Sequence, residues 1–266
     1  MVMEFVAGGE LYSLIQRGRM RNEDARLLGA ELLLGLEAAH SQSVIYRDMK
    51  PENVLIDKDG HVKITDFGLS KKIADRTFTL CGTPDYIAPE IIQNKGHNKA
   101  ADYWALGVVI YEMLTGLPPF YKENEDHTTF DRICGLTTDP PNFAIKWPRY
   151  LSAEARELIE GMLQHDVTKR VGCMKQGTAE IKGHAWYDGF SWEACAARET
   201  RGPFPVQMAS EEDTSAFDDY TGATGSKPSP FIGVETALLL AGAQLPKGKS
   251  LKAHEKARFE AEYSFF

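Results

Sequence analysis

The sequence predicts an α+β fold that is mostly helical, with one short β-hairpin and an extended C-terminal tail. Two apolar runs, Val54–Ile56 and Val62–Ile64, flank a segment with the dipeptide Asp59-Gly60, which is typical of tight hairpin turns. Trp104–Leu114 is apolar on nearly every side, which indicates a helix buried at the centre of a domain. Beyond about Arg198 the sequence is rich in Gly, Ser, Pro and acidic residues, which is typical of a partly disordered tail.

The register expected for this hairpin brings two oxygen ligands together at its open end. If the turn is centred between Asp59 and Gly60, residues equally far from it on the two sides face each other across the ladder. Asn53 and Asp66 are such a pair, so an amide and a carboxylate are expected side by side. Hard oxygen ligands of this kind suit Mg²⁺ that is bound together with substrate phosphates.

The loop before the hairpin adds an acid and a cation. Asp48 and Lys50 are separated by one residue, and Pro51 disfavours helix at that point. An acid, a cation and two oxygen ligands on one loop and hairpin suit phosphoryl transfer, in which catalysis is mostly positioning and charge neutralisation.

Three motifs in this order resemble the catalytic core of the protein kinases: Y-R-D-M-K-P-E-N at 46–53, D-F-G at 66–68 and A-P-E at 88–90. The sequence is most similar to the cyclic-nucleotide-dependent kinases of the AGC group of serine/threonine kinases. R-T-F-T-L-C-G-T-P-D-Y-I-A-P-E at 76–90, N-K-G-H at 94–97 and D-T-S-A-F-D-D-Y at 213–220 carry this closer resemblance, which covers Met1 to about Tyr220. It implies a protein-kinase-like fold whose large lobe is mostly helical.

The same resemblance implies the domain organisation. Residues 1–6 correspond to a hinge strand, 7–198 to the large lobe and 199–266 to the AGC-type tail. In the family, a small lobe with a Gly-rich loop and a strand lysine precedes the hinge, and neither motif occurs in this sequence. Three interpretations stay open: an active kinase, a non-catalytic module that binds substrates or regulatory subunits, and an incomplete gene sequence.

Catalytic and nucleotide-binding roles are also implied by the resemblance, with ATP and Mg²⁺ as the expected cofactors. Asp48 would accept the proton of the substrate hydroxyl, Lys50 would neutralise the transferring phosphoryl group, and Asn53 and Asp66 would each hold one Mg²⁺. Tyr46 and Met49 stand where the family commonly has His and Leu. The expected nucleotide contacts are Glu4 and Val6 at the adenine, Leu55 and Thr65 under the ring, Glu10 at the ribose, and Phe217 and Tyr220 from the tail.

Regulation is expected at Thr79, the phosphosite that the resemblance implies. Arg47 and Lys71 would clamp a phosphate there and order the loop outward from the catalytic centre. The alternative is an unmodified threonine in a solvated loop.

The resemblance further implies a preference for basic peptides. An acidic face would bind arginines before the target Ser or Thr, and an apolar pocket would take the residue after it. Thr83 together with Lys50 suggests Ser/Thr rather than Tyr specificity, and Asp85 stands where the family usually has Glu. The expected peptide-binding residues are Glu10, Glu52, Glu112, Leu80, Gly82, Pro84 and Ile87.

Several residues are expected to stabilise the fold. Glu90 and Arg170 would form an ion pair, and Asp102 would cap the central helix and hold the catalytic-loop backbone. Helices are predicted over Leu11–Gln16, over Glu23–His40 with Asn22 as its cap, and over Ser152–Leu163 with Ser152 as its cap. The histidines show no metal-ligand spacing and are expected to be ordinary surface or core residues.

Composition narrows the functional classes. The net charge of −8 disfavours a nucleic-acid partner and is compatible with basic peptide substrates. The four cysteines are widely spaced without a zinc or disulfide pattern, which favours a reducing compartment. The apolar run Ala237–Ala243 is too short to span a bilayer. The predicted location is therefore the cytoplasm or the nucleus.

Overall fold

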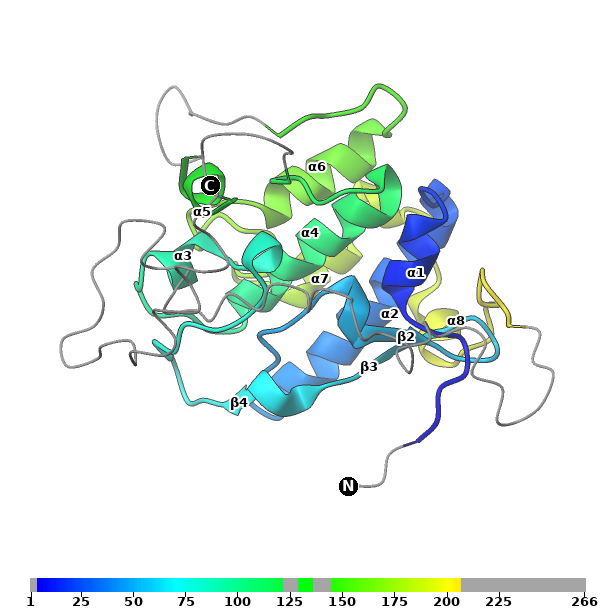
Figure 1. Cartoon of the computed structure of the whole chain (residues 1–266), viewed down its shortest axis with the longest axis horizontal. Helices are drawn as coiled ribbons and strands as arrows, with labels where there is room; N and C mark the ends of the chain where they lie inside the picture. The colour runs from blue at the N-terminus through cyan, green and yellow to red at the C-terminus, as the bar shows by residue number, and fades with distance from the viewer. Residues whose placement is uncertain (1–3, 122–128, 136–144, 207–266) are drawn as a thin grey trace, which may run out of the picture.

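A helical core surrounds α4 (Ala100–Thr115) in the computed structural model, which describes residues 4–121, 129–135 and 145–206. All residues of α4 from Ala100 to Leu114 are buried. Helices α2 (Asn22–Ser41) and α6 (Ala153–Met162) pack against α4 on two sides (Figure 1). The prediction of a buried central helix is confirmed. The helix begins at Ala100, four residues before the predicted start at Trp104.

The predicted helix caps have different outcomes. Ser152 caps α6, because its Oγ accepts a hydrogen bond from the backbone N–H of Ala155 at 3.1 Å. Asn22 is not a cap: it is the first residue of α2, and its Oδ1 accepts from Trp186 Nε1 at 2.8 Å. The prediction for Asn22 is wrong because a tertiary contact uses the side-chain oxygen that a cap would need. Helix α1 (Leu11–Gln16) has the predicted bounds.

The hairpin forms with the predicted strands but a different register. Strands β2 (Val54–Ile56) and β3 (Val62–Ile64) are antiparallel, and Leu55 faces Lys63. Continuing this register places Asn53 opposite Thr65, whose N–H donates to the carbonyl of Asn53 at 3.0 Å. The predicted pairing of Asn53 with Asp66 is therefore wrong.

Asp57 accounts for the shift of register. Its Oδ1 accepts hydrogen bonds from the N–H groups of Asp59 and His61, both at 3.0 Å. The backbone N–H of Asp57 also donates to the carbonyl of His61 at 2.8 Å. Side-chain bonds of this kind stabilise a longer loop than the two-residue turn that Asp59-Gly60 suggested, and Gly60 adopts a positive φ of 87° within it.

The hairpin lies between the N-terminal segment and the chain that follows α8 (Trp192–Ala196). Gly8 N donates to Ile56 O at 2.8 Å, and Val206 N donates to Lys58 O at 3.1 Å. A Cβ at Gly202 would lie 2.3 Å from the carbonyl carbon of Gly60, so this crossing needs glycine. The predicted tail residues Phe217 and Tyr220 lie outside the described residues.

No helix in the described ranges combines the length and the apolarity that crossing a membrane requires.

The remaining elements are short and border the helical core. Strand β1 (Val44–Ile45) pairs with β4 (Lys71–Lys72). This pairing joins the start of the loop at 46–53, here called the catalytic loop, to the segment at 66–90, here called the activation segment. The other elements are η1 (Pro51–Asn53), η2 (Phe67–Leu69), η3 (Pro84–Tyr86), α3 (Pro89–Ile92), α5 (Thr129–Gly135), α7 (Thr178–Lys182), η4 (Ala185–Tyr187) and α8 (Trp192–Ala196).

Candidate active site

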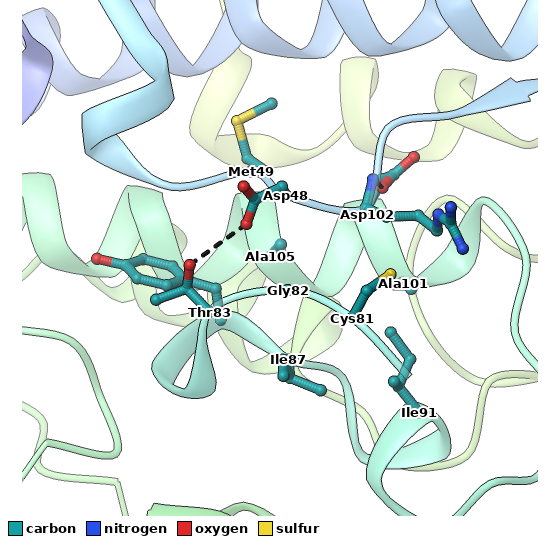
Figure 2. A pocket seen from close by; sticks show the side chains of 12 residues that line it. Asp48, Met49, Cys81, Gly82, Thr83, Ile87, Ile91, Ala101, Asp102 and Ala105 are labelled. Atoms are coloured by element: carbon teal, nitrogen blue, oxygen red, sulfur yellow. Dashed lines mark hydrogen bonds between the residues drawn. The ribbon is translucent and has the colours of Figure 1, made fainter. Parts of the chain in front are cut away.

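Asp48 is the centre of a compact polar cluster between the catalytic loop and the activation segment. Its buried carboxylate accepts from Asn53 Nδ2 at 2.8 Å and from Thr83 Oγ1 at 3.3 Å, the bond drawn in Figure 2. Lys50 Nζ lies 3.4 Å from Asp48 and donates to Thr83 Oγ1 at 2.9 Å. The structure therefore brings together the three residues with expected catalytic roles and adds the Thr83 hydroxyl.

Asp102 fixes the backbone of this loop. Its carboxylate accepts from the N–H groups of Tyr46 at 2.9 Å and Arg47 at 2.8 Å. Arg47 has a positive φ of 72°, a conformation that costs about 1–3 kcal/mol and persists only when its surroundings enforce it. His40 Nε2 lies 2.6 Å from the same carboxylate. Asp102 therefore holds the loop and is itself held by a neighbouring helix. The prediction that Asp102 caps α4 is wrong, because it is the third residue of that helix and its oxygens bond the loop instead.

Asn53 and Asp66 are both close to the ring of Tyr46. Burial raises the pKa of the Tyr46 phenol, and the charges of Asp48 and Asp66 raise it further, whereas a bond with Asn53 lowers it. Asp66 is exposed at a positive φ of 51°, and its Oδ1 accepts from Gly68 N at 3.0 Å. The two expected metal ligands thus share a neighbour, although they do not face each other across the hairpin.

The donor set fits a nucleotide-bound Mg²⁺. The described residues contain no cluster of three or more His, Cys, Asp or Glu side chains that could hold a metal ion alone. Mg²⁺ characteristically binds one or two protein oxygens together with substrate phosphates and waters. One amide from Asn53 and one carboxylate from Asp66 are consistent with that mode of binding.

The expected adenine-binding residues lie along one edge of the hairpin. Glu10 forms an isolated antiparallel bridge with Leu55. Val6 is buried, and Glu4 is exposed and forms an ion pair with Lys63. Leu55 on β2 and Thr65, directly after β3, are half-buried.

Three acidic side chains gather around Tyr86. The Tyr86 hydroxyl donates to Glu112 Oε2 at 2.7 Å. Burial raises the pKa of Glu112 from 4.5 to about 7, and the charges of Glu52 and Asp85 also raise it, against the lowering effect of the Tyr86 bond. Burial likewise raises the pKa of Glu52 and of Asp85. Tyr86 therefore already supplies Glu112 with a hydrogen-bond partner in the absence of a peptide.

This acid cluster, Glu52, Asp85 and Glu112, retains unused acceptors. Glu52 Oε2 and Asp85 Oδ1 are buried without a hydrogen-bond partner. Buried carboxylate oxygens are normally paired, so an unpaired oxygen requires an explanation. An arriving cation would supply the missing donors and would offset the burial that raises the pKa of all three carboxyl groups.

A cavity adjoins the Asp48 cluster and is formed by the catalytic loop, the activation segment and the start of α4 (Figure 2). Gly82 and Ile87, two of the residues expected to contact peptide, line it together with Asp48. Leu80 and Pro84 do not line this cavity.

Thr79 lies exposed on the activation segment, 3.5 Å from the hydroxyl of Thr77. Lys71 Nζ donates to Thr77 Oγ1 at 2.8 Å. Arg47 donates from Nε to the carbonyl of Leu69 at 2.7 Å, and its Nη1 is buried without a partner. Of the two expected clamp residues, Lys71 therefore bonds the Thr77–Thr79 pair, whereas Arg47 bonds the backbone of Leu69.

Glu90 and Arg170 lie together at the floor of the activation segment. Arg170 Nη1 and Nη2 donate to the two oxygens of Glu90 at 2.8 and 2.9 Å, and the arginine side chain is fully buried. This bidentate pair joins α3 to the chain after α6.

Sequence reasoning missed the supporting roles of His40 and Tyr86. Both bonds connect residues far apart in the chain, His40 with Asp102 and Tyr86 with Glu112. The buried charge of Glu112 was the one available signal, because it required a partner that the sequence could not locate.

Comparison with known proteins supports the kinase resemblance. Residues 1–187 match the family model described as protein kinase domain. The chain is 44% identical to the cAMP-dependent protein kinase catalytic subunit PRKX of Homo sapiens, in an alignment that covers 83% of this chain and 60% of the human protein. It is 45% identical to the cAMP-dependent protein kinase catalytic subunit 3 of Drosophila melanogaster, again over 83% of its length but 36% of that relative. The chain thus spans only part of these relatives.

Proposed function

The chain belongs to the protein kinase family, and on that premise we propose that it transfers the γ-phosphoryl group of ATP to serine or threonine in basic peptides. The observation that carries this proposal is the buried Asp48 carboxylate beside Lys50, Asn53 and Thr83. The substrate hydroxyl oxygen bonds to the γ-phosphorus, ADP leaves, and Asp48 accepts the hydroxyl proton. Lys50 neutralises charge on the transferring group.

ATP and Mg²⁺ are part of the proposal. Asn53 and Asp66 would hold Mg²⁺, which supplies positive charge to the phosphates when bound. Glu4, Val6, Leu55 and Thr65 border the place expected for the adenine. The tail residues Phe217 and Tyr220 remain predictions for the adenosine wall.

The acid cluster is proposed as the binding site for arginines that precede the phosphoacceptor. Its two unpaired buried oxygens, together with pKa values raised by burial, favour a cationic partner. We extend this acidic surface to Glu10 and assign the residue after the acceptor to Leu80, Gly82, Pro84 and Ile87.

Matched peptides test this function with the full-length protein and γ-³²P-labelled ATP. One peptide carries two arginines before a serine, the second has alanines there, and the third has tyrosine in place of the serine. We expect efficient labelling of the first peptide alone. Binding without labelling would instead indicate the non-catalytic module, and equal labelling of the first two would remove the proposed basic preference.

Phosphorylation of Thr79 is proposed to activate the enzyme. The phosphate, transferred from ATP with release of ADP and the hydroxyl proton, would lie beside Lys71 and Arg47. Thr79→Ala should strongly lower turnover because the loop loses its clamp. Unchanged turnover, together with no phosphate detected at Thr79 by mass spectrometry, would contradict this assignment.

The proposed partners are protein substrates with basic residues before the Ser or Thr, and a regulatory subunit or domain. The human and fruit-fly relatives are named as catalytic subunits, which supports a regulatory partner. We place this function in the cytoplasm or the nucleus, propose no nucleic-acid partner, and assign residues 199–266 to the AGC-type tail.

A further inference from the structure

Two unpaired polar atoms lie beside the activation segment. In the described part of the chain, six buried side-chain atoms lack a hydrogen-bond partner, and His97 Nε2 and Arg47 Nη1 are two of them. His97 is only 3% exposed, so water does not readily satisfy its ring nitrogen. Exceptions of this kind need an explanation, and a missing ligand is one that can be tested.

The backbone of His97 is attached to the threonine pair. Thr77 and His97 exchange both backbone hydrogen bonds, Thr77 N to His97 O at 2.9 Å and His97 N to Thr77 O at 2.8 Å. The hydroxyl of Thr77 contacts Lys71 on one side and lies 3.5 Å from the hydroxyl of Thr79 on the other. This bridge holds His97 next to the proposed phosphosite.

Burial, two cations and two carboxylates all act on the imidazole of His97. Burial lowers the pKa of the imidazole, and the charges of Arg47 and Lys71 lower it further. Glu90 and Asp102 act in the opposite direction. An anion between the cations and the ring would reverse the unfavourable contribution of Arg47 and Lys71.

We propose that His97 is a third ligand of the phosphate on Thr79, donating a hydrogen bond from Nε2 alongside Arg47 and Lys71. The inference rests on the proposed phosphorylation of Thr79. A phosphate offers three strong acceptor oxygens, enough for all three donors. The phosphate would satisfy both unpaired atoms, and its bond to His97 would tie it to the segment that leads into α4, whose Asp102 holds the catalytic loop.

The test uses the full-length protein with phosphothreonine incorporated at position 79. His97→Leu removes the donor, and His97→Gln places an amide N–H near the former Nε2. The matched control is His165→Gln, a half-buried histidine whose Nε2 already bonds the carbonyl of Ile133. The readouts are the phosphate pKa from ³¹P NMR and the rate of dephosphorylation by an added phosphatase, each compared with the urea-unfolded chain.

We expect His97→Leu to raise the phosphate pKa and to speed dephosphorylation roughly tenfold, the effect of losing one hydrogen bond to a charged group. His97→Gln should restore most of the protection, and the control should match the wild type. If the phosphate is protected in the wild type and equally protected in His97→Leu, the proposed role of His97 is overturned but the clamp by Arg47 and Lys71 is not. A wild-type phosphate that behaves as in the unfolded chain would overturn the Thr79 clamp as well.

A measurement on the wild type covers the case in which His97→Leu does not fold. With ¹⁵N-labelled histidine, phosphorylation of Thr79 should shift the Nε2 resonance of His97 and leave that of His165 in place. An unmoved His97 resonance would refute the contact.

Discussion

At the scale of single residues, Glu112 shows how burial prepares a carboxyl group for a cationic partner. Its pKa is raised from 4.5 to about 7, first by burial and then by Glu52 and Asp85. The folded chain therefore holds this proton more tightly than the unfolded chain does. The resulting stabilisation is complete below pH 4.5 and is lost as the pH rises to about 7.

Glu112→Gln should therefore make the protein more stable than the wild type near pH 8, with the difference shrinking as the pH falls toward 4.5. The amide can still accept from Tyr86 but carries no charge to desolvate. Thermal unfolding at several pH values measures this, with the exposed Glu157→Gln as control. A pH-independent difference between Glu112→Gln and the wild type would contradict the assigned shift.

The same carboxyl group should make peptide binding pH-dependent. An arginine prefers ionised Glu112, so the KM for an arginine peptide should fall as the pH rises through about 7. The dependence should be absent in Glu112→Gln, and that variant should bind the peptide more weakly at pH 8. Identical pH profiles of KM in the two proteins would exclude Glu112 from the peptide site.

At the scale of elements, the first turn of α4 positions the catalytic loop. Asp102 accepts the N–H groups of Tyr46 and Arg47, so a helix buried in the core fixes residues next to Asp48. The sequence predicted this helix from its apolar run. The hydrogen bonds of Asp102 were expected only through the kinase resemblance, because their partners lie more than fifty residues away.

Asp102→Asn should release the catalytic-loop backbone. An amide offers one acceptor oxygen, so it cannot accept from Tyr46, Arg47 and His40 as the carboxylate does. We expect the amide protons of Tyr46 and Arg47 to exchange with solvent roughly tenfold faster or more. Hydrogen-exchange NMR measures this, with the exposed Asp188→Asn as control, and unchanged protection would show that other contacts hold the loop.

The hairpin shows which part of an element the sequence left undetermined. The alternation of apolar residues and the dipeptide Asp59-Gly60 were enough to predict both strands. The register depended on the Asp57 side chain, which stabilises a longer loop by bonding Asp59 and His61. Turn dipeptides give the position of a reversal, whereas side-chain bonds within the loop decide its length.

At the scale of the whole molecule, buried ionic contacts connect segments that are distant in sequence. Arg170 binds both oxygens of Glu90 and also donates to the carbonyl of Ala100, joining α3, the start of α4 and the chain after α6. The acid cluster and the pairing of Thr77 with His97 are also long-range. The ion pair of Glu90 with Arg170 was predicted and is confirmed, whereas the pairing of Thr77 with His97 depends on how the segments pack and could not be predicted from local patterns.

Glu90→Gln should lower the free energy of unfolding by about 3–5 kcal/mol, because it leaves the Arg170 charge buried without its partner. The control is Glu37→Gln, which breaks a partly exposed pair with Lys182 and should cost about 1 kcal/mol or less. Urea unfolding measures both losses. Equal small losses would show that the Arg170 charge finds adequate compensation elsewhere.

The proposed kinase function depends above all on Asp48 acting in phosphoryl transfer. The most direct test is the rate of γ-phosphoryl transfer to an arginine-containing serine peptide by Asp48→Asn, with the exposed Asp166→Asn as control. We predict a fall of about 10²–10⁴-fold in kcat for Asp48→Asn, since the variant loses the proton acceptor, with little change for the control. Transfer by Asp48→Asn at the wild-type rate would contradict the assignment of this site.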